Sequence, residues 1–134
     1  MQPLLLGAGL TLGLASPLAA QCGAQKVLPI VYEAGAQFGS SLSFVDGGMA
    51  VGAWLSSVFA LQGGAVFLAE GAPGSYSLAV PVGPADASSG QRFGRAVDGA
   101  GKWLAVGADG DGALGPDAGA AYVFELTPNG PAER

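Results

Sequence analysis

Histidine is absent from this chain of 134 residues, and cysteine occurs once. Without histidine there is no Ser-His-Asp triad, no imidazole general base and no histidine-ligated zinc. A single cysteine excludes an intrachain disulfide and a CxxC redox pair. Basic residues are scarce as well, with five Lys and Arg against ten Asp and Glu, a net charge of −5. Such a chain binds a phosphate backbone poorly, so we expect no nucleic-acid partner.

Glycine and apolar residues are abundant instead. The chain has 24 glycines and nine prolines, and half of its residues are hydrophobic. The apolar content is enough for a packed core, so the composition is not that of a disordered chain. Frequent glycine and proline with little Lys or Glu argue against long helices and for short strands joined by turns. The composition therefore predicts an all-β fold.

The first 20 residues have the layout of a secretory signal peptide. The apolar segment 4–15 is shorter than the roughly 20 residues that a membrane span needs. Pro17 and the small residues before Gln21 suit cleavage, although no Lys or Arg precedes the apolar segment. We expect a secreted or cell-envelope (periplasmic or extracellular) protein; a buried or interfacial N-terminal segment is the alternative. Cys22 follows the expected cut, and Gln21 before it favours a free thiol over lipidation.

Two stretches of the chain repeat one another. Phe38-Gly39 recurs as Phe93-Gly94, an offset of 55 residues (93 − 38), and AVGA at 50–53 recurs at 105–108 with the same offset. A fixed period that preserves glycines and apolar residues is typical of stacked structural repeats.

Alternating and apolar runs within these repeats predict short strands. We expect the hairpin turns at Asp46-Gly47-Gly48 and around Val97-Asp98-Gly99. A lone apolar run near the N-terminus is expected to join the second sheet and complete two four-stranded antiparallel sheets, whereas the tail 128–134 should fray. The expected strands are Lys26–Tyr32, Leu42–Val45, Met49–Ala53, Gly64–Ala69, Tyr76–Val82, Lys102–Ala108 and Ala121–Leu126.

These residues resemble FG-GAP repeats, the propeller blades of integrin α-subunits and of many secreted bacterial proteins. The motifs are RFGR at 92–95, LAVGA at 104–108 and GAAYVF at 119–124, with FG at 38–39, AVGA at 50–53 and GAVF at 64–67. Trp54 and Asp109 stand where the family has the proline of Gly-Ala-Pro. With the signal peptide expected at 1–20, the resemblance implies a first repeat with its preceding edge strand (25–82), a second repeat (83–127) and a tail (128–134). The implied fold is a partial β-propeller of two blades.

The loop after the second Gly-Ala pair is acidic. Calcium prefers six to eight oxygen ligands from a flexible, glycine-bearing loop. The resemblance implies calcium ligands at Asp109, Asp111, Gly115 (through its carbonyl) and Asp117, with affinity weakened because Ala113 has no side-chain oxygen. The alternative is a solvated acidic turn without metal. The matching loop of the first repeat, 54–62, carries no acid; its apolar residues suit a contact patch instead: Trp54, Leu55, Val58 and Phe59.

The resemblance implies a non-catalytic exported module for adhesion or for recognition of an extracellular protein or glycan. Two alternatives are a structural envelope or truncated repeat protein without its own ligand, and an accessory domain of a secreted hydrolase. Because propellers have 4–8 blades and the chain supplies two, a homo-oligomer of three or four copies, a fragment of a longer protein and a sandwich-like monomer are all open.

Overall fold

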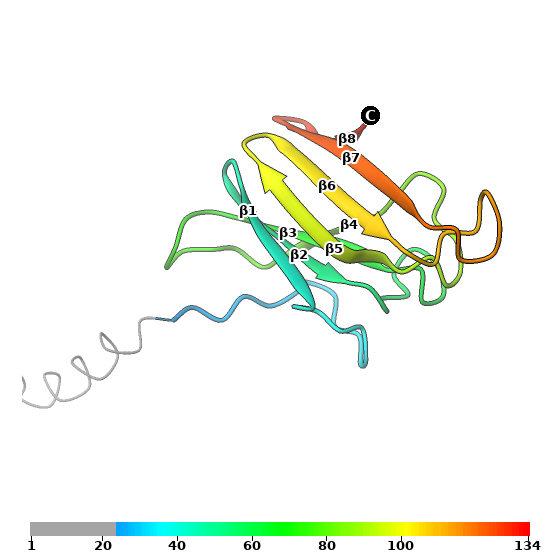
Figure 1. Ribbon diagram of the computed structural model, residues 1–134. Helices are drawn as coiled ribbons and strands as arrows, with labels where there is room; N and C mark the ends of the chain where they lie inside the picture. The colour runs from blue at the N-terminus through cyan, green and yellow to red at the C-terminus, as the bar shows by residue number, and fades with distance from the viewer. Residues whose placement is uncertain (1–23) are drawn as a thin grey trace, which may run out of the picture.

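The computed structural model describes residues 24–134. This part of the chain is all-β and contains two four-stranded antiparallel sheets and no helix, as predicted (Figure 1). No segment of it therefore qualifies as a membrane-crossing helix. The predicted signal peptide and Cys22 lie outside the described residues. The strands are β1 (Ser41–Val45), β2 (Gly48–Ala53), β3 (Ala65–Glu70), β4 (Val80–Val82), β5 (Phe93–Ala100), β6 (Trp103–Ala108), β7 (Ala120–Thr127) and β8 (Gly130–Glu133), in the orders β1-β2-β3-β4 and β5-β6-β7-β8.

The duplication seen in the sequence is reproduced in the backbone. Gly48 lies opposite Glu70 across β2 and β3, and Trp103 lies opposite Glu125 across β6 and β7, each 55 residues further on. The left-handed backbone positions follow the same offset, and they include non-glycine residues that rarely adopt positive φ. The five matched pairs are Gly35/Gly90, Gln37/Arg92, Gly39/Gly94, Gln62/Asp117 and Gly64/Gly119.

The two sheets pack face to face, and both are oriented the same way (Figure 1). We call the face of the first sheet that carries Ala50 and Val66 its forward face. The forward face of the second sheet is the one that carries the equivalent residues, Ala105 and Ala121. The opposite face is the rear face. The forward face of the first sheet packs on the rear face of the second, with β5 lying against β1 and β2. The core between them contains Ala50, Val66, Phe93, Leu104, Val106, Ala108 and Phe124.

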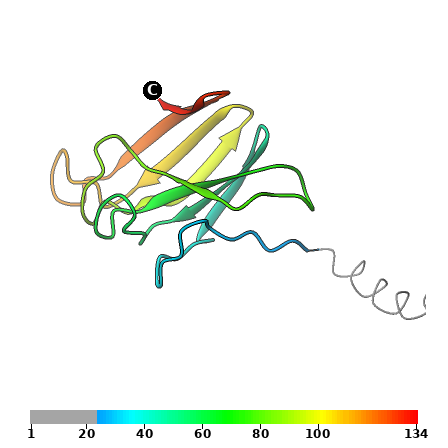
Figure 2. The same cartoon turned by 180° about the vertical axis from the view of Figure 1, so that it is seen from behind.

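The rear face of the first sheet is covered in part by the N-terminal segment 24–40, which runs along that sheet in Figure 2. Phe38 meets Phe67 edge to face with ring centroids 5.4 Å apart, and Phe93 meets Tyr122 in the same way at 5.3 Å. Such pairs stabilise beyond the area they bury. The two Phe-Gly motifs therefore anchor equivalent positions of the two sheets, as expected for structural residues.

The prediction that the N-terminal strand joins the second sheet was wrong. Lys26–Tyr32 does not join the second sheet; Pro29 forms an isolated bridge with Ala79, and Ile30 N donates to Ala79 O at 2.8 Å. Val27 packs with the apolar cluster on the rear face of the first sheet, which holds the segment there. The prediction for the tail was wrong as well, because the fourth strand of the second sheet is β8.

A short turn explains why the tail forms a strand. Thr127 Oγ1 donates to Gly130 O at 2.7 Å and accepts from Asn129 N at 3.2 Å, which fixes the reversal between β7 and β8. Pro131 is tolerated because β8 is an edge strand. Arg134, just past β8, binds the Glu125 carboxylate on β7.

Two further expectations need correction. Asp98 lies inside β5 opposite Ala105, and the hairpin turns at Gly101-Lys102, the positions that match Asp46-Gly47. β4 is shorter than the expected 76–82. The backbone of Tyr76 is instead bound at both its N–H and its C=O by the Gln25 amide, at 2.9 and 2.8 Å.

Candidate functional site

The acidic loop between β6 and β7 holds Asp111 in an inward-facing position. Its side chain is only 4% exposed, the lowest of any acidic residue that the structure describes. Its Oδ2 accepts hydrogen bonds from Gln91 Nε2 at 2.7 Å and Tyr122 OH at 2.9 Å, and its Oδ1 accepts from Ala113 N at 2.9 Å. The Ala113 N–H above all, then Gln91 and Tyr122, lower the pKa of Asp111, because each bond favours the charged form.

The Tyr122 hydroxyl joins the loop to the connector before β5. It accepts from Gln91 Nε2 at 2.6 Å and lies 2.8 Å from Asp86 Oδ1. Burial, then the carboxylates of Asp86 and Asp111, raise the pKa of Tyr122, so the phenol keeps its proton. The hydroxyl proton of Tyr122 is therefore shared between the carboxylates of Asp86 and Asp111. Asp86, Gln91 and Tyr122 were missed from the sequence; the one signal was a Tyr at the position where the first repeat has Phe67.

The other three predicted calcium ligands are engaged elsewhere. Arg92 reaches Asp109 at 3.6 Å and Asp117 at 3.9 Å, through its two terminal nitrogens. The Gly115 carbonyl accepts from Ala118 N at 3.1 Å. Both carboxylates are more than half exposed, so these ion pairs contribute little to stability. They do place a guanidinium between the two acids that were expected to share a cation.

As arranged, the four residues do not fit a calcium ion. The Asp111 oxygens face the interior, and Asp109 and Asp117 face Arg92. Throughout residues 24–134, no three acidic or cysteine side chains cluster closely enough to hold a metal. Calcium binding here stays a prediction, and it requires the loop to rearrange.

The first repeat fills the corresponding position with different chemistry. Ser56 occupies the place of Asp111 and is fully buried. It donates to Glu33 Oε2 at 2.8 Å, and Ser57 N donates to Glu33 Oε1 at 2.5 Å. In both repeats one carboxylate thus binds a backbone N–H of the loop, although it comes from the N-terminal segment in one case and from the loop in the other.

The expected contact patch on loop 54–62 is only partly present. Val58 packs against the rear-face cluster, and the Arg95 guanidinium lies 4.2 Å from the ring centre of Trp54. Leu55 is half-buried, whereas Phe59 is 44% exposed. The four side chains do not form one open apolar surface.

A groove of about 500 Å³ opens between the two sheets at the end that carries the hairpin turns. Its walls are aliphatic, and no aromatic side chain lines it. Ligand-binding pockets have volumes in this range and are lined mostly by apolar side chains. The lining residues are Val45, Asp46, Gly47, Gly48, Met49, Leu68, Ala69, Glu70, Lys102, Leu126, Thr127, Pro128, Gly130 and Pro131.

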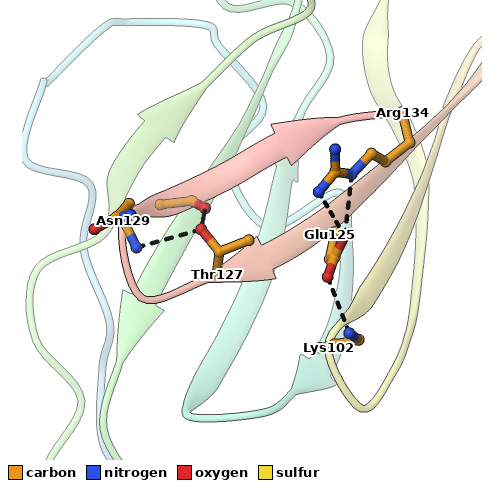
Figure 3. A network of polar contacts seen from close by, with 6 residues as sticks. Lys102, Glu125, Thr127, Asn129 and Arg134 are labelled. Carbon is orange, nitrogen blue, oxygen red and sulfur yellow. Dashed lines mark hydrogen bonds and ion pairs between the residues drawn. The ribbon is translucent and has the colours of Figure 1, made fainter.

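The rim of this groove is acidic. Lys102, its one basic residue, donates to Glu125 at 2.9 Å, and Arg134 binds the other Glu125 oxygen at 2.7 Å (Figure 3). These two bonds, that of Lys102 first, lower the pKa of Glu125. Asp46 and Glu70 are exposed and form no ion pair within the described chain. The groove therefore presents two free carboxylates beside apolar walls.

Comparison with known proteins supports the resemblance for part of the chain. Residues 82–124 match the family model for the FG-GAP repeat. The match runs from the end of β4 to Phe124 in β7, which confirms the family prediction for the second repeat. No curated protein matches the chain.

Proposed function

We propose that this protein is a non-catalytic, exported recognition module built from FG-GAP-type repeats, and that it binds an extracellular protein in adhesion. The family match over residues 82–124 supports a recognition module of the propeller type. The layout of residues 1–20 supports export to the periplasm, the envelope or the medium.

The groove between the sheets carries this proposal. Its aliphatic walls accommodate the side chains of an extended segment, and the carboxylates of Asp46 and Glu70 at its rim attract a basic one. The ligand that fits is a protein segment with Lys or Arg beside apolar residues. A glycan fits less well, because sugar rings pack best on aromatic side chains and the groove has none.

The polar groups of the groove are suited to binding rather than to catalysis. Thr127 is the only hydroxyl residue in the lining, and its oxygen already donates to Gly130 O and accepts from Asn129 N. No nucleophile is paired with a base there, as covalent catalysis requires.

A peptide array with Lys or Arg placed among apolar residues, run beside a glycan array, tests the proposal. We expect the chain to select basic-apolar peptides, with affinity that falls as salt rises. The double variant Asp46→Asn, Glu70→Gln should weaken binding at least about tenfold. Asp117→Asn removes a charge from the exposed β6–β7 loop, outside the groove, and serves as the control.

Three results would overturn the proposal in different ways. Equal binding by the double variant would remove the groove as the site. Selection of glycans without peptides would show that the ligand class is wrong. Selection of neither would favour a structural envelope protein.

A further inference from the structure

The forward face of the second sheet is open, whereas the same face of the first sheet is buried by its neighbour. Its small and apolar side chains are solvent-exposed, with Trp103 at 43% and Val123 at 42%. A shallow apolar hollow lies over β5, β6 and β7. Large contiguous apolar patches on the surface of a soluble protein commonly mark an interaction site. The face carries Ala96, Asp98, Ala100, Trp103, Ala105, Gly107, Ala121, Val123 and, opposite Trp103, Glu125.

The molecule itself shows what covers a face of this kind. Where the first sheet meets the second, Ser41 Oγ donates to Gly94 O at 2.9 Å, and Gly99 N donates to Ser43 Oγ at 2.9 Å. A Cβ at Gly94 would lie 2.4 Å from Ala65 O, so the two backbones approach closely there. Within the chain, β5 of the second sheet thus packs on the forward face of the first sheet, against β1 and β2.

The matching surface is also open in this chain. β1 is the counterpart of β5, and its rear face carries Leu42 and Phe44, which are 57% and 61% exposed. Their equivalents in β5 are Val97 and Gly99, which pack against the first sheet. The N-terminal segment covers Ala53, Phe67 and Ala69 on β2 and β3 but leaves these two side chains in solvent.

We propose that a second copy of this chain docks its β1 on the forward face of β5 and β6, head to tail. Asp98 occupies the position of Ser43 and would accept the N–H of Phe44 of the neighbouring copy, as Ser43 accepts from Gly99. Phe44 takes the place of Gly99 in this contact, and Ala100 takes the place of the larger Val45. Because a Cβ at Gly99 would also lie 2.9 Å from the Phe44 carbonyl oxygen, the two copies must sit further apart at this point than the two sheets within the chain.

A head-to-tail contact has consequences that a two-fold dimer does not. Each copy has one forward face and one β1 surface, so a pair leaves one of each unsatisfied. Assembly therefore continues until the rotation between copies closes a ring, or else grows as an open filament. Propellers have 4–8 blades. With the two sheets of residues 24–134 in each copy, rings of three or four copies have six or eight sheets, which lies within that range.

Light scattering on the full chain, over a range of concentrations, measures the assembly. We expect a discrete trimer or tetramer. Ala105→Glu on the forward face and Phe44→Glu on β1 should each reduce the mass to that of one chain. Leu114→Glu, at a 93% exposed apolar residue in the β6–β7 loop, introduces the same charge elsewhere and should leave the mass unchanged. Circular dichroism verifies that all three variants fold.

Mixing the Phe44→Glu and Ala105→Glu chains distinguishes a head-to-tail contact from a two-fold one. The Phe44→Glu chain keeps an intact forward face, and the Ala105→Glu chain keeps an intact β1. A head-to-tail contact therefore predicts a 1:1 complex of the two and nothing larger. A monomer at every concentration overturns the proposal, as does an assembly that survives both substitutions or a mixture that forms no complex.

Discussion

Two glycines at equivalent positions allow the contact between the sheets to be measured. Gly39 and Gly94 have nearly the same left-handed backbone, with φ of 96° and 90°. At Gly39 nothing lies within 4 Å of an added Cβ, whereas at Gly94 the Ala65 carbonyl oxygen would lie 2.4 Å away. The assembly proposed above places Gly39 against a neighbouring copy, so both substitutions are made in the monomeric Ala105→Glu chain. There the pair Gly39→Ala and Gly94→Ala separates backbone strain from steric exclusion by the neighbouring sheet.

The expected magnitudes differ for the same reason. A Cβ in a left-handed conformation costs about 1–2 kcal/mol, and both variants incur that cost. Gly94→Ala also forces a backbone shift of the kind that overpacking causes, about 1–3 kcal/mol more. Ala65 cannot move away easily, because it is paired with Ala53 inside the first sheet. We expect a loss of roughly 1–2 kcal/mol at position 39 and about 2–5 kcal/mol at position 94.

Urea unfolding monitored by circular dichroism, with melting temperatures as a second measure, resolves this difference. One kcal/mol corresponds to about 4 °C or more in a domain of this size. Equal losses for the two variants would refute the reasoning, since they would show that the sheets do not approach as closely as the structure has them. A larger loss at Gly39 would refute the equivalence of the two repeats.

Three other predictions concern the acidic loop. Hydrogen bonds lower the pKa of Asp111 in the folded chain, so its charge stabilises fully above the unfolded value of about 3.9, and that stabilisation is lost as pH falls through the lower folded value. The melting-temperature gap between the unchanged chain and Asp111→Asn should therefore stay constant from pH 5 to 8 and shrink below about pH 4; a pH-independent gap would contradict this. Tyr122→Phe should cost about 1–3 kcal/mol in urea unfolding, because it removes a partner of a buried carboxylate; no loss would show that water replaces the hydroxyl. Millimolar Ca²⁺ should raise the melting temperature of Arg92→Gln more than that of the unchanged chain, and equal shifts would show that the guanidinium does not compete for the site.

The sheets could be predicted because their signals are local and repeated. Asp46-Gly47 between apolar runs specifies a hairpin, and the 55-residue offset carries the same register into the second sheet. The Asp-Gly pair at 98–99 gave a false turn, since Gly99 is required for a different reason. A Cβ there would meet Val45 Cγ1 at 2.4 Å, so this glycine serves the approach of the two sheets.

The strands at the two ends could not be assigned in the same way. An apolar run such as Lys26–Tyr32 pairs with whichever edge its neighbours leave free, and that depends on contacts far along the chain. Here the Gln25 amide and Val27 hold the segment on the first sheet. The tail was misjudged because its polar, proline-containing composition hides a turn built around the Thr127 hydroxyl.

The acidic loop shows why residue types alone are a weak guide to a binding site in a repeat. Its backbone follows the first repeat, down to the positive φ shared by Gln62 and Asp117. In the first repeat the carboxylate that binds the loop comes from Glu33; in the second, Asp111 supplies it from within the loop. Ser56 Oγ accepts from Val58 N at 3.3 Å, the counterpart of the bond from Ala113 N to Asp111, so the Asp111 carboxylate is first a structural group. The free carboxylates of Asp46 and Glu70 have no such internal partner in the described chain, and the case for recognition therefore rests on the groove rather than on the loop with more acids.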